Sequence, residues 1–193
     1  TALGSEDVVD YLRGDRSKEE SQSGGSLRTR TGVLGDIVNS SPVYVAAPNA
    51  SLYERASFTG ASSYAKFARD MADRTPVVYV GANDGMLHGF NASDEEAEWG
   101  EETYAFVPNS AIVNGLRTYS EPTYEHRYFV DGEMVVTDVY DTRDKRWKTI
   151  LVGTMGRGGP GVFALDVTDP DPENVKFLWE KNGTDIPSLG KNI

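Results

Sequence analysis

The chain has 193 residues and 38% hydrophobic content, which is enough for a packed core in one large domain or two small ones. Its formal net charge of −11 at pH 7 argues against a nucleic-acid partner, whose phosphates attract basic surfaces, and against adsorption to anionic lipids. The lack of cysteine excludes disulfides and thiol chemistry, and no apolar run reaches the roughly 18 residues of a transmembrane helix.

The first element in chain order is a predicted helix over Ser5–Leu12. Ser5 is a suitable N-cap, two acidic residues follow it, and the apolar residues give the helix one hydrophobic side. Arg13-Gly14 is expected to end the helix. The polar, Gly/Ser-rich residues 15–25 are typical of a mobile loop.

Residues 34–46 form a predicted polar corner that leads into a short strand at Val43–Ala46. The corner carries four polar residues that are expected to bond the local backbone: Asp36, Asn39, Ser40 and Ser41. A structural turn is the favoured interpretation of this segment, ahead of a catalytic role.

Residues 49–74 are predicted to be an insertion that contains a helix from about Ser62 to Ala72. Apolar side chains recur there at helical spacing, at Tyr64, Phe67, Ala68 and Met71. Ser62 or Ser63 is a suitable cap for this helix. We expect it to pack over a sheet edge, and the alternative is a helix that binds a partner.

The strongest hairpin signal lies in Thr75–Ala92. Two β-rich runs, Val77–Gly81 and Met86–Phe90, flank the turn residues Ala82–Gly85, where Asn, Asp and Gly tolerate the conformations of a tight turn. Apolar residues fall on both faces of the predicted pair. A sheet packed between neighbouring sheets is therefore expected.

The same pattern returns in Thr149–Asp166, where an apolar run, a glycine-rich turn and a second apolar run follow each other. Gly81 and Gly153 are 72 residues apart, which is longer than one plain propeller blade, so we expect extra chain between the copies. Repeated strand pairs of this kind indicate a radially repeated β architecture.

Further strands are predicted between and after the two copies. They cover Glu102–Val107, Glu125–Val130, Val135–Tyr140 and Val175–Trp179. Asp131-Gly132 is expected to be a hairpin turn that pairs the second of these strands with the third. A helical turn is expected near Asn109–Leu116.

The glycine-rich residues 156–161 resemble a phosphate cradle at first sight. A nucleotide cradle needs a helix N-terminus after the loop, whereas a strand-like run, Val162–Asp166, follows here. We therefore predict a hairpin turn.

An acidic cluster follows that run. Asp166, Asp169 and Asp171 bring carboxylates together, and hard cations such as Ca²⁺ are bound by oxygen ligands, so they are candidates for part of a metal site. The prolines among them favour a stiff turn held by local Asx bonds as the alternative.

His88 and His126 are the only histidines. The chain lacks a Gly-x-Ser-x-Gly nucleophile elbow, and its histidines lack the spacing of zinc ligands. We expect both to be strand residues satisfied by hydrogen bonds, and we predict that the chain is not an enzyme.

Several stretches together resemble the C-terminal domain of PilC/PilY-type type IV pilus biogenesis factors. They are LGDIVNSSPVYV, TPVVYVGANDGMLHGF, YFVDGEMVVTDVY and GRGGPGVFALDVTDP, preceded by YLRGD, and they run from about Tyr11 to Trp179. The resemblance implies a mainly β fold, a modified, quinoprotein-like β-propeller. The chain is expected to be a partial ring with one or two inserted helices.

Within that single domain, the N-terminal helix and loop are assigned to residues 1–33, the propeller strands to 34–193, and the helical insertion to about 60–73. The chain starts at Thr1 and ends after a loop-like segment, so we expect it to be a piece of a longer protein whose signal peptide lies outside this segment.

The resemblance also implies a function. Members of the family are exported, reside at the cell surface, outer membrane or pilus tip, promote pilus assembly against retraction and hence twitching motility, and act as adhesins. Minor pilins or other pilus proteins, and host-cell receptors, are the implied partners. In the family an EF-hand-like Ca²⁺ loop lies further towards the C-terminus, so the resemblance implies that it lies beyond Ile193. No such loop is found in this sequence, and no cofactor is expected in this segment.

Arg13-Gly14-Asp15 spells the tripeptide that integrin-type receptors read. A plain helix stop is one interpretation, and the family's link to host-cell adhesion makes these residues candidates for an interaction site. Two further alternatives for the whole chain stay open, a quinoprotein-like dehydrogenase propeller and a plain structural scaffold.

Overall fold

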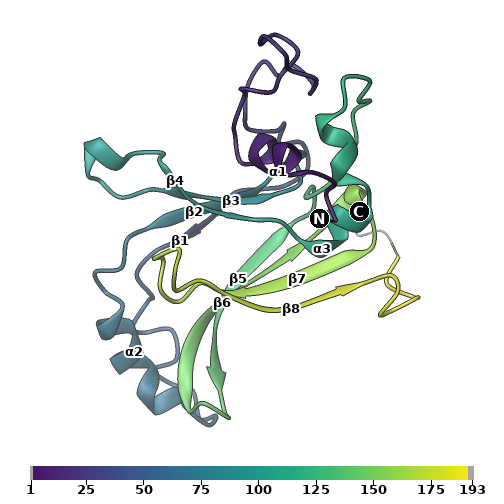
Figure 1. Cartoon of the computed structure of the whole chain (residues 1–193). Helices are drawn as coiled ribbons and strands as arrows, with labels where there is room; N and C mark the ends of the chain where they lie inside the picture. Colours follow the sequence, from purple (N-terminus) through teal and green to yellow (C-terminus); the bar gives the residue numbers. More distant parts are fainter. Residues whose placement is uncertain (1, 191–193) are drawn as a thin grey trace.

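The structure is a computed structural model that describes residues 2–190, and it is mainly β (Figure 1). Eight strands form two four-stranded antiparallel sheets, each in chain order. Sheet 1 contains β1 (Val43–Val45), β2 (Val77–Gly81), β3 (Leu87–Asn91) and β4 (Glu102–Phe106). Sheet 2 contains β5 (Met134–Asp141), β6 (Arg146–Thr154), β7 (Gly161–Asp166) and β8 (Lys176–Asn182).

The helices are short. The α-helices are α1 (Glu6–Leu12), α2 (Tyr64–Asp70) and α3 (Asn109–Val113), and the 3-10 turns are η1 (Ala61–Ser63), η2 (Glu96–Glu98), η3 (Leu116–Ser120) and η4 (Gly156–Gly158). Within residues 2–190, no helix has the length and apolar character that a membrane crossing requires. The predicted N-cap is confirmed, because Ser5 Oγ accepts a bond from Val8 N–H at 3.4 Å. The predicted end is confirmed by Gly14, which has φ +106°.

The two sheets are stacked, with α1 on the outer side of sheet 1 (Figure 1). Buried side chains fill the space between them, among them Tyr79 and Leu87 from sheet 1 and Phe163 and Leu165 from sheet 2. The ring centroids of Phe106 and Phe163 lie 5.4 Å apart across this interface. Two face-packed antiparallel meanders are two successive blades of a propeller, so the expected partial ring is confirmed.

The outer face of sheet 2 carries an apolar row of residues that is partly exposed. One row across the sheet joins Val135, Val152, Ala164 and Trp179 through consecutive strand pairs. Val135 is 64% exposed and Trp179 is 42% exposed. Such a face is what a propeller blade offers to a following blade.

The repeat inferred from the sequence is confirmed, since β2–β3 and β6–β7 are the central pairs of the two sheets. The repeated glycine allows a close approach in both copies. A Cβ on Gly153 would overlap the ring of Phe163, and a Cβ on Gly81 would lie 2.5 Å from the carbonyl oxygen of Val130. The extra chain between the copies is the connector from β4 to β5, which contains α3 and η3.

The predicted strand at Glu125–Val130 and its hairpin turn are wrong. This segment has no strand, and β5 pairs with β6 instead. Phe129 and Val130 are fully buried, and Phe129 N–H donates to Asn83 Oδ1 at 3.1 Å. A connector that crosses between two packed sheets needs apolar residues as much as a strand does, which explains the misleading pattern.

The corner at residues 36–41 forms long-range bonds instead of the expected local ones. Asn39 donates through its backbone and side chain to the carboxylate of Asp131, at 3.1 and 2.7 Å. Ser40 Oγ accepts a bond from Gly81 N–H at 3.0 Å. The corner is therefore attached to the central hairpin and to the connector that enters sheet 2.

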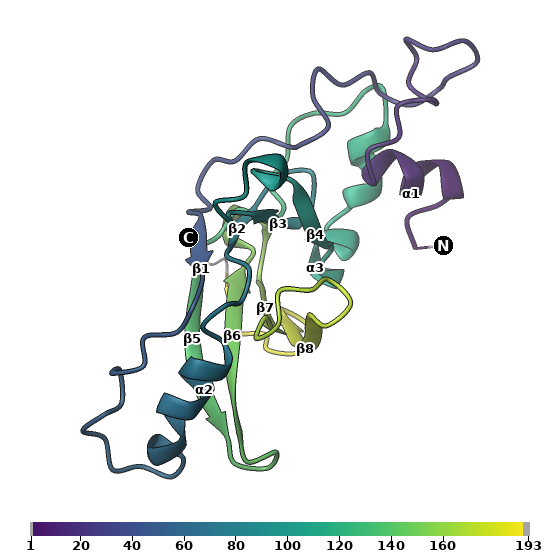
Figure 2. The same cartoon turned by 90° about the vertical axis from the view of Figure 1, so that its left-hand side faces the viewer.

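The insertion between β1 and β2, both in sheet 1, packs on sheet 2 (Figures 1 and 2). The predicted helix is confirmed and ends at Asp70. Its Tyr64 and Phe67 surround Trp147 of β6, and Trp147 Nε1–H donates to the Gly60 carbonyl at 3.1 Å. Ser63 occupies the predicted cap position but makes no cap bond, because its Oγ accepts a bond from Trp147 and donates to Gly60 instead.

Candidate functional sites

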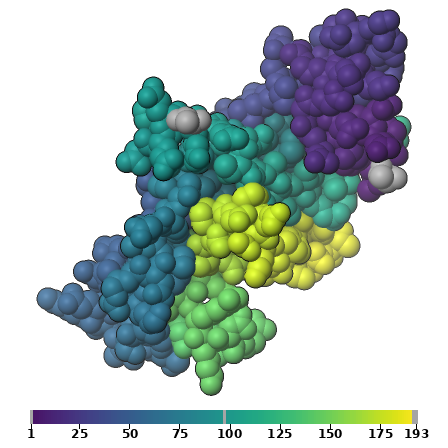
Figure 3. All heavy atoms as spheres, turned by 60° about the vertical axis from the view of Figure 1, so that its left-hand side comes forward, coloured from purple at the N-terminus to yellow at the C-terminus, as the bar shows by residue number. Residues whose placement is uncertain are grey.

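The Arg-Gly-Asp turn lies in the N-terminal segment, which projects at one end of the molecule (Figure 3). Arg13 and Asp15 are exposed on either side of Gly14. The carboxylate of Asp15 accepts bonds from Ser17 N–H at 2.7 Å and Ser17 Oγ–H at 3.0 Å. These two bonds hold the pKa of Asp15 below its usual value, so the turn presents a cation and an anion together.

A buried ion pair fixes the backbone of this turn. Glu19 is fully buried and receives Arg30 Nε–H at 2.9 Å. Arg30 also donates to the carbonyl oxygens of Tyr11 and Asp15, at 2.7 and 2.8 Å. Burial raises the pKa of Glu19, but hydrogen bonds from Arg16 and Arg30 outweigh it and lower that pKa to about 2. Residues 15–25 are thus anchored at their centre, and the expected mobile loop is wrong there.

A pocket of about 300 Å³ lies beside this turn, on the outer face of sheet 1. Its lining is Leu12, Arg13, Val33, Leu34, Asp84, Met86, His88, Phe90, Glu102 and Ala105. Buried His88 lies between two carboxylates, with Nδ1 2.5 Å from Glu102 and Nε2 3.1 Å from Asp84. Asp84 also accepts a bond from Gly35 N–H at 2.7 Å, so the network joins β3, β4 and the polar corner.

His88 is expected to make stability depend on pH. Burial alone would lower its pKa, but the bonds and charges of Asp84 and Glu102 outweigh burial and raise it. A raised folded-state pKa means that the charged pairing stabilises fully below the unfolded pKa of about 6.5 and is lost as pH rises through the folded value. In urea titrations, the stability advantage of the wild type over His88→Gln should therefore be larger at pH 5.5 than at pH 8.5. An equal or reversed difference would contradict this assignment.

His126, the second histidine, pairs with Asp36 through Nε2 at 2.9 Å on the surface. Asp36 also accepts a bond from Asn83 Nδ2–H at 3.0 Å. The prediction that both histidines are satisfied by hydrogen bonds is confirmed. The prediction that both lie in strands holds for His88 and is wrong for His126.

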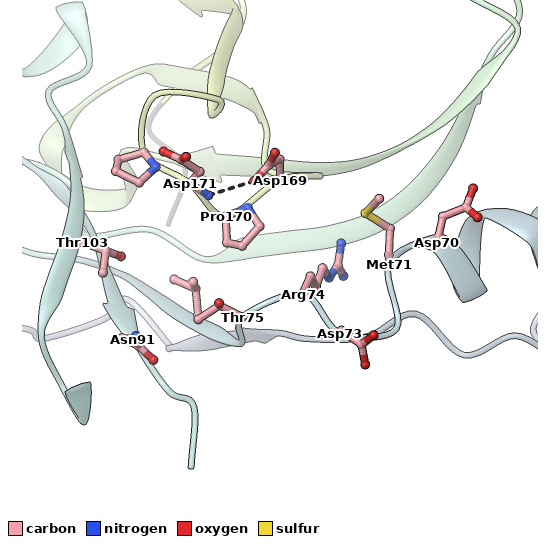
Figure 4. Close-up of a pocket in the computed structure, with 12 residues that line it drawn as sticks. Asp70, Met71, Asp73, Arg74, Thr75, Asn91, Thr103, Asp169, Pro170 and Asp171 are labelled. Carbon is pink, nitrogen blue, oxygen red and sulfur yellow. Dashed lines mark hydrogen bonds between the residues drawn. The ribbon is translucent and has the colours of Figure 1, made fainter. Parts of the chain in front are cut away.

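A second hollow, of about 510 Å³, lies between α2, the start of β2 and the turn after β7 (Figure 4). Four carboxylates line it, from Asp70, Asp73, Asp169 and Asp171. Arg74 lies at its base and donates to Thr149 Oγ1 at 2.8 Å, to the Thr168 carbonyl at 3.3 Å and to the Ala46 carbonyl. The lining of this hollow is therefore acidic, and Arg74 links the two sheets beneath it.

The three acidic residues singled out as metal candidates are used in turn bonds. Asp166 accepts bonds from the backbone and side chain of Thr168, at 3.1 and 2.5 Å. Asp169 accepts one from Asp171 N–H at 3.0 Å (Figure 4). Across residues 2–190, no three His, Cys, Asp or Glu side chains gather as metal ligands would. These local hydrogen bonds to the carboxylates fit the Asx-turn alternative, and the calcium site stays a prediction.

The glycine-rich residues 156–161 form a turn between two strands, as predicted. Its η4 segment leads directly into β7, without the helix N-terminus that a phosphate cradle requires.

A family model described as the PilY1 beta-propeller domain matches residues 34–192. A type IV pilus biogenesis factor PilY1 homolog of Xylella fastidiosa (strain Temecula1 / ATCC 700964) is 53% identical over 195 residues, covering 100% of this chain and 15% of the relative. Type IV pilus biogenesis factor PilY1 of Pseudomonas aeruginosa (strain PAK) is 44% identical over 188 residues, covering 96% of this chain and 15% of the relative.

Among solved structures, the crystal structure of the Pseudomonas aeruginosa PilY1 C-terminal domain is similar at a TM-score of 0.49 and 41% identity. The match covers 66% of this chain and 22% of that chain. The chain spans about 15% of the length of the curated relatives named above.

Proposed function

Since the chain belongs to the PilY1 beta-propeller domain family, we propose that it serves type IV pilus biogenesis as a non-enzymatic assembly factor that opposes pilus retraction. The observation that carries this proposal is the 53% identity, over the whole chain, to a PilY1 homolog named as a type IV pilus biogenesis factor. The protein acts at the cell surface, outer membrane or pilus tip.

Protein–protein interaction is the proposed mode of action, with minor pilins or other pilus proteins as partners. Both histidine–aspartate pairs connect structural elements. Asp84 contacts His88 and accepts a bond from Gly35 N–H, and Asp36 of the polar corner contacts His126. The exposed side chains described above belong to loops, such as Arg13 and Asp15, and to the outer face of sheet 2, such as Val135 and Trp179. Loops and sheet faces are the surfaces that propellers offer to partners.

A second part of the proposal is adhesion through Arg13-Gly14-Asp15. The support is geometric: both charged side chains are exposed, and the backbone between them is held by Arg30. A contact surface that is already ordered loses less entropy on binding than a mobile loop does. Host-cell receptors that recognise an adjacent cation and anion are the proposed partners.

Deleting the gene for the full-length protein tests the proposal. We expect loss of surface pili and of twitching motility, and recovery of pili when the retraction motor is also removed, because an anti-retraction factor is dispensable without retraction. Pili counted by electron microscopy provide the measurement. A deletion strain with normal pili would refute the assembly role.

The same strain, complemented with Arg13→Ala/Asp15→Ala, separates adhesion from assembly. Pili should form as in the wild type, while attachment to host cells should fall several-fold. Lys18→Ala, an exposed change in the same segment, is the matched control. Equal attachment by both variants would remove the adhesin part and leave the assembly part standing.

A further inference from the structure

The pocket beside Arg13 is built like a small-molecule site. It is a recess between the end of α1, the start of the polar corner and the outer face of sheet 1. Its apolar walls come from Leu12, Val33, Leu34, Met86, Phe90 and Ala105. Sites of this kind combine mostly apolar walls with a few convergent polar groups, and about 300 Å³ lies at the small end of their usual size.

The lining of this pocket carries charged groups of both signs. Glu102 uses Oε1 to contact His88, and its Oε2 has no hydrogen-bond partner among the described residues. Asp84 lies on the other side of His88, so two carboxylates flank one imidazole. Arg13 also lines the pocket, and within residues 2–190 its guanidinium has no ion pair.

We propose that this pocket binds a free apolar α-amino acid, such as leucine or phenylalanine. The ammonium group would contact Glu102, the carboxylate would contact Arg13, and the side chain would lie against Met86, Phe90 and the other apolar walls. A zwitterion of this kind offers opposite charges to Glu102 and Arg13 at once.

Simpler ligands match the pocket less well. An uncharged apolar molecule would leave the Arg13 guanidinium and Glu102 Oε2 without a partner and cover them from water, which is unfavourable. A fatty acid would satisfy Arg13 with its carboxylate but would bring its alkyl chain against Glu102. A single amino acid also suits the volume, and a ligand of so few atoms should bind with a Kd on the order of 0.1–1 mM.

The test is calorimetric titration of the full-length protein with L-leucine and L-phenylalanine, followed by the same titration with altered ligands. N-acetyl-L-leucine lacks the ammonium group, L-leucinamide lacks the carboxylate, and glycine lacks the side chain. Each of the three should bind at least 10-fold more weakly than L-leucine. No saturable binding of leucine or phenylalanine up to 10 mM, a limit about ten times the expected Kd, would overturn the proposal.

Variants locate the site. Glu102→Gln and Arg13→Gln should each weaken leucine binding several-fold, and Ala105→Trp, a change at an exposed wall residue, should fill the pocket and abolish binding. Lys18→Gln is the control, because it changes an exposed charge in the same segment outside the pocket. Leucine binding that survives Ala105→Trp would place the site elsewhere and refute the assignment. The wild-type ligand series decides the chemistry even where a variant folds poorly.

Discussion

Replacing Glu19 by Gln should lower the free energy of unfolding by about 3–5 kcal/mol, the usual cost of removing one partner of a buried ion pair. Glu19 accepts bonds from the side chains of Arg16 and Arg30 and from Arg30 N–H, and its side chain is 0% exposed. The variant leaves the Arg30 guanidinium, itself stacked on Tyr11 at 3.6 Å, buried without its counter-charge. Urea denaturation followed by circular dichroism measures the loss.

The matched control for this prediction is Lys66→Ala. Lys66 pairs with Asp70 at 2.5 Å on the surface of α2, with side chains 71% and 49% exposed. Exposed pairs contribute about 1 kcal/mol or less, so this variant should stay near the wild type. Hydrogen exchange should rise first in residues 16–30 of Glu19→Gln. Equal stability of Glu19→Gln and Lys66→Ala would show that the buried pair is not needed.

Phe163→Ala is the second variant with a large expected effect, a loss of about 3–5 kcal/mol. Phe163 is completely buried at the centre of the interface between the sheets, where it packs on Phe106 and covers Gly153. Removing the ring leaves a cavity against Gly153, and this glycine has no side chain that could move into it. Urea denaturation measures the change.

Phe177→Ala offers a direct comparison, since Phe177 stacks on the same Phe106 with ring centroids 5.9 Å apart. Its side chain lies on β8 and is 54% exposed, so the ring buries less area and its removal should cost less than half as much as Phe163→Ala. A similar loss for both variants would mean that the inter-sheet packing is not centred on Phe163.

The sequence predicted best those elements whose signals are local. The β2–β3 hairpin, α1 with its Ser5 cap and the glycine-rich turn before β7 each depend on residues a few positions apart. The corner containing Asn39 and the connector containing Asp131 were misread because they bond to each other across 92 residues. Tertiary partners at such separation cannot be read from turn propensity.

The candidate sites show the same limit. Alternation along Met86–Phe90 places His88 on one face with Met86 and Phe90, and those three line the pocket together. That face acquires Glu102 only through the register of β3 with β4, which is shifted by an irregularity between Gly89 and Phe90. The buried role of Glu19 was hidden in a polar, Gly/Ser-rich segment, where burial is the exception.

The insertion that leaves sheet 1 and packs on Trp147 imposes an order on folding. Trp147 bonds to Gly60 across 87 residues, and Tyr64 bonds to Asp138 across 74. Closing loops of this length costs chain entropy before any contact forms, so these are late events. A chain delivered N-terminus first exposes the aromatic face of α2 until the β5–β6 hairpin has emerged. During that interval, the insertion is open to proteases and to chaperones.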